Sequence, residues 1–197
     1  VHISSSEVYG FKKITNKISY SENVQTLPQN AYAKAKLEAE TLILRSNLKI
    51  IKNTIILRLF NVYGIGQTHK TIINDIISKL SLNKKRIKLK NIYDERDYIF
   101  LNDVIDAIRY SLLSKNISGV YNVSSGKTIS VKNIFKVIKD IIGKNEIKLL
   151  DSRNFKYSSF SSGKNIKIRK KIGWKPRYSS IEAFKENIKK ILIYKNK

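Results

Sequence analysis

A tyrosine and a lysine four residues apart are the pair in this sequence best suited to proton transfer. Tyr32 and Lys36 lie in an alanine-rich stretch, and residues four apart on a helix share a face. A free tyrosine, with a pKa near 10, is a poor base at neutral pH, but a neighbouring ammonium group favours the phenolate. At ~4 Å and an effective dielectric constant of ~20, this attraction is about 4 kcal/mol. The pair can therefore supply a general base, although an isolated Tyr-x-x-x-Lys match more often marks a solvated helix face.

Further polar residues lie beside apolar runs at three places in the chain. Ser5 and Glu7 belong to a hydroxyl-rich segment that follows Val1 to Ile3, and ligands of open α/β sheets bind beyond the carboxyl ends of strands. Asn61 ends a second apolar run, and its amide can bind a sugar or a phosphate. Arg96 carries a guanidinium group that can clamp a diphosphate. Taken singly, each group also fits a polar turn or a surface charge pair.

The elements that position these groups follow from the hydrophobic pattern. Apolar residues at helical spacing predict helices at 31–46, 72–80, 103–113, 131–141 and from 180 onwards, with Ser130 as a cap. In the third helix, Val104, Ala107, Ile108 and Leu112 are expected on one buried side. Short β-branched and aliphatic runs predict strands at 1–4, 53–60, 87–89, 98–101 and 120–123. This alternation predicts an α/β fold with a parallel sheet, and no linker divides it.

The net charge of +24 raises the question of nucleic-acid binding, because basic faces neutralise phosphates. The lysines are spread over every expected element, and no nucleic-acid module is visible. We therefore interpret the charge as a compositional bias, and we expect no nucleic-acid partner. A basic protein still attracts a nucleotide diphosphate.

Other classes of protein find little support. No apolar run reaches the ~20 residues of a membrane helix, and the N-terminus lacks the pattern of a signal peptide. There is no cysteine, and the two histidines, His2 and His69, are too few for most histidine-based metal sites. The sequence thus favours a cytoplasmic protein without a metal site or a membrane partner.

The order and spacing of the polar groups resemble the extended short-chain dehydrogenase/reductase family, in particular its NAD-dependent epimerase/dehydratase members that modify nucleotide sugars. The motifs are Ser-Ser-x-x-Val-Tyr-Gly at 4–10, Tyr-x-x-x-Lys at 32–36, Leu-Arg-x-Phe-Asn-x-x-Gly at 57–64 and Arg-Asp-Tyr-Ile at 96–99. Residues 119–126 and 172–176 look like the C-terminal substrate domain of that family. The resemblance covers nearly the whole chain.

This resemblance implies the C-terminal part of a Rossmann-like doubly wound parallel sheet interleaved with a small α/β substrate-binding domain. Residues 1–64 and 98–115 would belong to the dinucleotide-binding Rossmann domain, and residues 65–97 and 116–197 to the substrate domain. The expected ligands are NAD or NADP and a nucleotide-diphosphate sugar. A homodimer is also compatible, since family members often pair through the helix that carries the tyrosine.

The resemblance also assigns roles to single residues. Tyr32 would be the catalytic base, Lys36 would hold the nicotinamide ribose, and Ser5 would bridge the substrate and Tyr32. Phe60 would pack beside the nicotinamide. The remaining positions implied to bind the nucleotide diphosphate or the sugar are Asn61, Arg96 and Arg153.

The reaction type depends on the two residues after Ser5. Related 4,6-dehydratases carry a pair of carboxylates there, whereas this chain has Ser6 and only one carboxylate, Glu7. This weakens dehydration without excluding it, and Glu7 stays a candidate acid. We rank a 4-epimerase first, a 4-keto-sugar-nucleotide reductase second and a 4,6-dehydratase third. A catalytically inactive nucleotide-sugar binding protein is the alternative from a different class.

The chain departs from the family pattern at its start. It contains no methionine and no Gly-x-x-Gly-x-x-Gly turn, whose backbone holds the cofactor pyrophosphate. We therefore expect a fragment, with something on the order of a hundred residues before Val1. Alone, such a fragment would bind the cofactor poorly and would have little activity.

Overall fold

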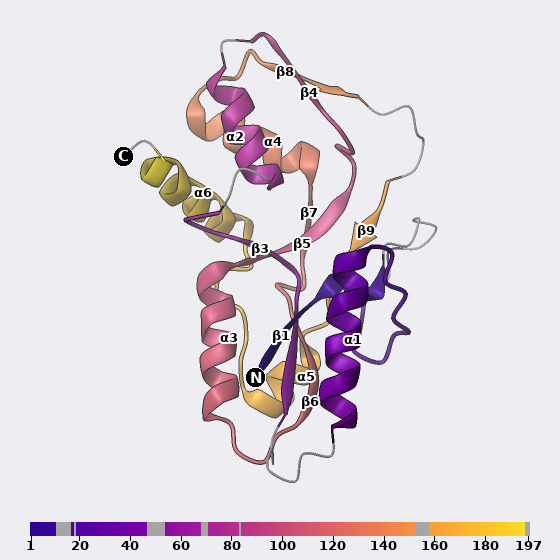
Figure 1. The fold of residues 1–197 in the computed structure, drawn as a ribbon. Helices are drawn as coiled ribbons and strands as arrows, with labels where there is room; N and C mark the ends of the chain where they lie inside the picture. The colour runs from indigo at the N-terminus through magenta and orange to yellow at the C-terminus, as the bar shows by residue number, and fades with distance from the viewer. Residues whose placement is uncertain are drawn as a thin grey trace.

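The computed structural model describes residues 1–10, 17, 19–46, 54–67, 71–82, 84–152 and 158–195 of the chain. A three-stranded parallel sheet forms the centre of the lower part in Figure 1. Its strands, in spatial order, are β1 (His2–Ser5), β2 (Ile55–Leu59) and β6 (Gly119–Val123). A short 3-10 helix, η1 (Ser6–Tyr9), follows β1 directly. The predicted α/β fold with a parallel sheet is confirmed.

Helices cover both faces of this sheet. Helix α1 (Ala31–Arg45) packs against β1, while α3 (Leu101–Leu113) and α5 (Ile166–Ile172) pack against β2 and β6. Alternate side chains of β2 reach the two faces: Leu57 joins the apolar core beneath α3 and α5, whereas Arg58 meets α1. Figure 1 shows α1 and α3 on opposite sides of the strands. Coverage of both faces is typical of doubly wound α/β folds.

The upper part in Figure 1 combines short strands with three helices. Strand β5 (Glu95–Phe100) pairs with β3 (Asn61–Tyr63), β7 (Thr128–Ser130) and β9 (Phe160–Ser161), and β4 (Arg86–Leu89) pairs with β8 (Lys148–Asp151). The helices are α2 (Ile72–Ser81), α4 (Val131–Ile142) and α6 (Ile181–Lys195). Their apolar faces meet in one cluster, whose fully buried members include Ile76, Leu80, Ile134, Ile138 and Ile188.

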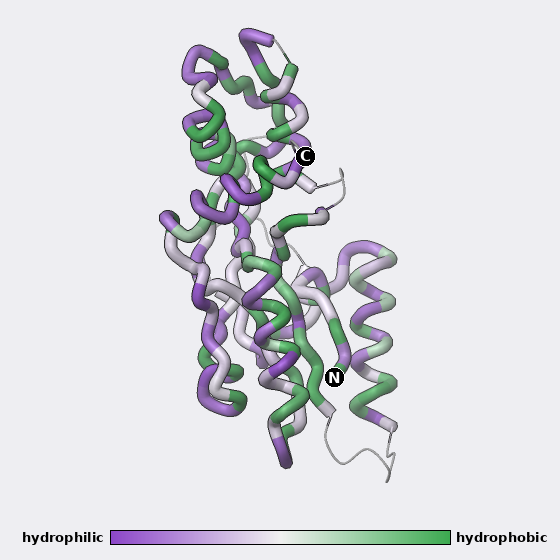
Figure 2. The backbone as a smooth tube through the Cα atoms, turned by 90° about the vertical axis from the view of Figure 1, so that its left-hand side faces the viewer, coloured by the Kyte–Doolittle hydropathy of each residue, from purple (hydrophilic) through white to green (hydrophobic). Residues whose placement is uncertain are grey.

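Hydropathy follows this arrangement. Figure 2 shows mostly apolar strands at the centre of the lower part, while the flanking helices alternate between apolar and polar residues. The helix ends obey local rules as well: Ser130 accepts a hydrogen bond from the backbone N–H of Asn133, at 3.1 Å, and so caps α4. Gly143, with φ of 77°, ends the same helix in the left-handed conformation. The predicted cap at Ser130 is confirmed.

All five predicted helices and all five predicted strands are present, with small shifts at their ends. The elements not predicted from the sequence are the 3-10 helix η1, the strands β3, β7, β8 and β9, and the seven-residue helix α5. The sequence analysis was wrong about Leu112, which is 68% exposed, because Ser111 rather than Leu112 lies on the buried side of α3.

The division into two domains stays a prediction, but the structure differs from it at one strand. Strand β6 falls in the range assigned to the substrate domain, 116–197, yet it pairs with β2 over its full length. Its pattern of consecutive buried residues suits a strand inside a parallel sheet. The chain therefore returns to the lower sheet after α3 before it enters the upper part again.

Candidate active site

The carboxyl ends of β1 and β2 place several of the predicted residues at one edge of the sheet. Ser5, the last residue of β1, is the register partner of Leu59, and Phe60 and Asn61 follow Leu59 directly. Ser5 is 8% exposed, and its Oγ accepts a hydrogen bond from the backbone N–H of Glu7 at 3.2 Å, which starts η1. This edge is where ligands of parallel α/β sheets bind.

The first turn of α1 is tied to the same edge. Asn30 caps the helix through its Oδ1, which accepts from the backbone N–H of Ala33 at 2.8 Å. Its Nδ2 donates to Glu7 Oε2, also at 2.8 Å. The carboxylate of Glu7 therefore positions the start of the helix that carries Tyr32. Its predicted role as an acid stays a prediction.

Tyr32 and Lys36 share one face of α1, as their spacing predicts. The Lys36 ammonium nitrogen lies 5.8 Å from the centre of the Tyr32 ring. It also donates a hydrogen bond to the carbonyl oxygen of Ile3 in β1, at 2.8 Å. An ammonium group has three N–H donors, so this bond leaves capacity for a ligand. Tyr32 is 53% exposed, so its phenol is accessible to a bound molecule.

Asn61 lies on β3 and Arg96 on the neighbouring strand β5. Asn61 Nδ2 donates to the carbonyl oxygen of Asp97 at 3.1 Å. The Arg96 guanidinium donates to the carbonyl oxygen of Ser159 at 2.9 Å, to the hydroxyl of the same residue at 2.5 Å and to Asp94 at 3.3 Å. Its side chain is only 15% exposed. A diphosphate that binds Arg96 has to replace or share these contacts.

Asp97 does not form the surface charge pair with Arg96 that an isolated Arg-Asp sequence favours. It is fully buried, and it accepts hydrogen bonds from the backbone N–H and the hydroxyl of Ser125 and from the backbone N–H groups of Gly126 and Gly163. Burial raises the pKa of Asp97 to about 6, against the opposing effect of these hydrogen bonds. Asp97 thus ties the strand that carries Arg96 to two neighbouring loops.

Phe60 lies within the protein rather than on an open surface. It is 2% exposed and packs with Val8, Tyr9 and Tyr20. Its ring also lies against Gly163, where an added Cβ would be 2.5 Å from Phe60 Cε2. Packing accounts for this burial, and contact with a cofactor stays a prediction. Arg153, the last predicted site residue, lies outside the described residues.

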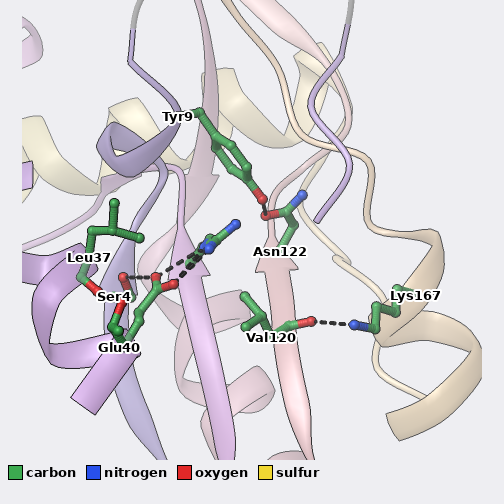
Figure 3. Close-up of polar contacts among 9 residues, drawn as sticks. Ser4, Tyr9, Leu37, Glu40, Val120, Asn122 and Lys167 are labelled. Carbon is green, nitrogen blue, oxygen red and sulfur yellow. Dashed lines mark hydrogen bonds and ion pairs between the residues drawn. The ribbon is translucent and has the colours of Figure 1, made fainter. Parts of the chain in front are cut away.

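The sequence analysis missed a buried ion pair below this edge. Arg58 of β2 and Glu40 of α1 are 5% and 1% exposed, and Arg58 Nη2 lies 2.6 Å from Glu40 Oε2. Figure 3 shows Glu40 bonded to Ser4. A signal was available: Glu40 is four residues after Lys36 and eight after Tyr32, so the three share a helix face.

Two features are absent from the described part of the chain. None of its helices is both long and apolar enough to cross a bilayer. Within the same residues, no group of three or more histidine, cysteine, aspartate or glutamate side chains is arranged to hold a metal ion.

Comparison with known proteins adds an independent observation. The family model described as GDP-mannose 4,6-dehydratase matches residues 1–187. The chain is 26% identical over 200 residues to the GDP-6-deoxy-D-mannose reductase of Pseudomonas aeruginosa, covering 98% of this chain and 64% of that protein.

Two solved structures share the fold. RMD from Pseudomonas aeruginosa, in complex with NADPH, superimposes with a TM-score of 0.82 at 26% identity, over 98% of this chain and 65% of that one. The UDP-N-acetylglucosamine 4-epimerase of Methanobrevibacter ruminantium, in complex with UDP-N-acetylmuramic acid, gives 0.76 at 25% identity, over 99% and 62%. These similarities confirm the Rossmann-like α/β fold. The chain thus spans somewhat less than two thirds of the length of each of these proteins.

Proposed function

The chain belongs to the GDP-mannose 4,6-dehydratase family of extended short-chain dehydrogenases/reductases, and we propose that it carries the catalytic and substrate-binding residues of an NAD(P)-dependent enzyme. This enzyme acts at C4 of a nucleotide sugar. The observation that carries the proposal is the position of Tyr32 and Lys36 on one face of α1, beside the end of the strand that supplies Ser5. Tyr32 is half exposed there, whereas Ser5 is held nearly buried.

Each of these side chains has a defined task in the proposed reaction. Tyr32 takes the proton of the C4 hydroxyl as the C4 hydrogen leaves with its electron pair. Ser5 donates a hydrogen bond to the same sugar oxygen and so orients it. Lys36 places its ammonium group over the Tyr32 ring and so adds positive charge beside the proposed base. The reverse transfers return a proton and a hydride to C4.

The cofactor in this proposal is NAD or NADP, in line with the NADPH bound to the Pseudomonas protein. The residues present fit the nicotinamide end, because Lys36 keeps N–H donors for a ribose hydroxyl and Tyr32 is accessible beside it. When bound, the nicotinamide accepts or returns the hydride. Phe60 would pack close by, at the start of β3.

The nucleotide diphosphate would extend from the sugar towards the upper part. Asn61 belongs to β3, and the strand paired with it, β5, carries Arg96. The guanidinium fork of Arg96 can bind two phosphate oxygens at once, in exchange for its present bonds to Ser159. Arg153 would add a second arginine to the same group.

Epimerisation at C4 is our first candidate, since it requires chiefly Tyr32, Lys36 and Ser5. Reduction of a 4-keto sugar nucleotide is the second, and the similarity to the Pseudomonas reductase over 98% of the chain supports it. Dehydration ranks third. Ser6 supplies no carboxylate, and Glu7 is engaged with the helix cap Asn30.

The test uses a fusion protein in which a relative supplies the glycine-rich cofactor-binding segment. In this fusion protein, the segment of the Pseudomonas reductase that precedes the matched region is placed before Val1, and the native reductase serves as the positive control. The fusion is incubated with NAD(P)⁺ or NAD(P)H and with UDP-, GDP- and dTDP-linked sugars. Inversion at C4 without net cofactor change identifies an epimerase. Stoichiometric NAD(P)H oxidation identifies a reductase, and a 4-keto-6-deoxy product identifies a dehydratase.

The same experiment can reject the proposal. A fusion that binds nucleotide sugars and NAD(P)H but turns over none of them is a binding protein without catalytic function. Calorimetric titration of the 197-residue chain alone adds a second readout, because a catalytically inactive binding protein should bind the nucleotide sugar with no dependence on added NAD.

A further inference from the structure

Three buried polar residues form a row across the lower sheet. Ser4 of β1 is the register partner of Arg58 in β2, and Arg58 is the partner of Asn122 in β6. They are 2%, 5% and 0% exposed. Buried polar groups are costly unless their hydrogen bonds are satisfied. A row of them through the middle of a sheet therefore calls for partners on the covering helix.

Helix α1 supplies that partner in Glu40. Its Oε1 accepts from the Ser4 hydroxyl and from Arg58 Nε at 3.0 Å, and its Oε2 accepts from Arg58 Nη2 at 2.6 Å. Figure 3 shows these contacts converging on the Glu40 carboxylate. A paired guanidinium–carboxylate contact fixes orientation as well as distance.

The far side of Arg58 is closed by aromatic and amide groups. Its guanidinium carbon lies 4.8 Å from the centre of the Tyr9 ring. The Tyr9 hydroxyl donates to Asn122 Oδ1 at 2.8 Å, and Asn122 Nδ2 donates to the carbonyl oxygen of Tyr20 at 3.0 Å. Arg58 thus binds Glu40 on one side and packs against the Tyr9 ring on the other, while its buried Nη1 makes no hydrogen bond within the described residues.

Two successive turns of α1 contact two consecutive residues of β1. Lys36 donates to the carbonyl oxygen of Ile3, and Glu40, one turn later, binds the hydroxyl of Ser4. Side chains four residues apart are ~6 Å apart along the helix axis. Two contacts at this spacing fix both the height and the rotation of α1 relative to the strand that ends in Ser5.

We propose that Glu40 and Arg58 are positioning residues that set the register of α1 against β1 and thereby hold Lys36 and Tyr32 beside Ser5. This inference rests on the proposed function for its catalytic meaning. The ion pair is buried beneath the site, so its effect reaches the site through the helix.

The test separates positioning from folding by replacing the whole pair with apolar residues of similar size. Removing one partner leaves an unpaired buried charge and destabilises the chain, whereas replacing both is often neutral or stabilising. The double variant Glu40→Leu/Arg58→Met is therefore expected to unfold at a urea concentration equal to or above that of the wild type. A second variant, Glu40→Gln, keeps the shape of the side chain and removes its charge.

The position of Lys36 is read by lysine acylation and mass spectrometry on the folded 197-residue chain. Lys34, an exposed residue of the same helix, is the internal control. In the wild type we expect Lys36 to react about tenfold more slowly than Lys34, the protection given by one hydrogen bond from a charged donor. In the double variant the two rates should become equal within about twofold, and in Glu40→Gln the protection should fall about threefold.

The result that overturns the proposal is a folded double variant whose Lys36 stays as protected as in the wild type. If that variant does not fold, unchanged protection in folded Glu40→Gln has the same meaning. The outcome is independent of turnover: a change in Lys36 protection together with an inactive fusion protein would reject the proposed function and keep the positioning role. In an active fusion, the double variant should lower kcat and leave the nucleotide-sugar Kd unchanged.

Discussion

The ammonium nitrogen of Lys36 lies 2.8 Å from the carbonyl oxygen of Ile3, two residues before the end of the strand that supplies Ser5. This bond links the helix of the proposed base to the strand of the proposed hydroxyl donor. The same ammonium lies over the Tyr32 ring, 5.8 Å from the ring centre. A contact inside the protein thus prepares the geometry in which a sugar and a cofactor would react.

Loss of this ammonium group should reduce turnover more than binding. In the active fusion protein, Lys36→Met is expected to lower kcat by roughly 10²–10⁴-fold, the range for a positioned proton-transfer group, because the positive charge beside Tyr32 is lost. Steady-state kinetics measures the effect. Lys34→Met, on the exposed side of the same helix, should stay within about twofold of the wild type. Equal losses in both variants would point to the helix as a whole.

Arg96 should contribute to nucleotide-sugar binding through its charge and its fork. Arg96→Gln is expected to weaken binding by about tenfold or more, the value of one charge-assisted phosphate contact. Isothermal titration of the 197-residue chain measures it, with Arg109→Gln on the exposed surface of α3 as the control. Unchanged affinity in Arg96→Gln, with the fold intact, would remove Arg96 from the site.

Asp97 should make stability depend on pH in an unusual direction. Its pKa is about 6 in the folded chain, against 3.8 as the ordinary value, so the folded state binds this proton more tightly. The contribution of Asp97 to the free energy of unfolding is therefore complete below pH 3.8 and is lost as the pH rises through about 6. The total change is on the order of 3 kcal/mol.

Urea unfolding of the wild type and of Asp97→Asn, measured from pH 4 to pH 7, isolates this contribution as a difference between two curves. The unfolding free energy of the wild type, relative to that of Asp97→Asn, should fall as the pH rises from 4 to 7. Parallel curves for the two proteins would contradict the assignment. Asp97→Asn should also be less stable throughout, because its amide offers one acceptor atom to several N–H donors.

Gly163 should tolerate no side chain. A Cβ at this position would lie 2.5 Å from Phe60 Cε2 and 2.6 Å from Ser124 Cβ, so Gly163→Ala is expected to cost about 1–3 kcal/mol of unfolding free energy. Gly143→Asn is a suitable control, because the space around Gly143 is open and asparagine tolerates its positive φ. Thermal or urea unfolding compares the two, and equal stability losses would refute the packing argument.

The sequence predicted those elements whose period was long enough to recognise. Helix α4 illustrates this, because Val131, Ile134 and Ile138 recur at helical spacing and Ser130 caps the first turn. By contrast, β9 has two residues and β3 and β7 have three. Such strands are defined by their partners in β5, far away in the chain, and local sequence carries no record of that pairing.

Site residues were predictable where spacing along one element decides the geometry. Tyr32 and Lys36 are an example, since a helix places residues four apart together. The environment of Asp97 was not predictable from the sequence, because its four hydrogen-bond donors come from loops about 28 and 66 residues later in the chain. The Glu40–Arg58 pair also joins a helix to a separate strand. In such cases only the folded chain reveals whether a charge lies at the surface or in the core.

The most direct test of the central claim is the turnover of the fusion protein with Tyr32→Phe. The account predicts that kcat falls by roughly 10²–10⁴-fold, because phenylalanine keeps the ring and removes the group that accepts the C4 proton. The Kd for the nucleotide sugar, measured on the same preparation, should stay within about threefold of the wild type. Wild-type turnover by Tyr32→Phe, or weakened binding with turnover retained, would contradict the role of Tyr32 as the catalytic base.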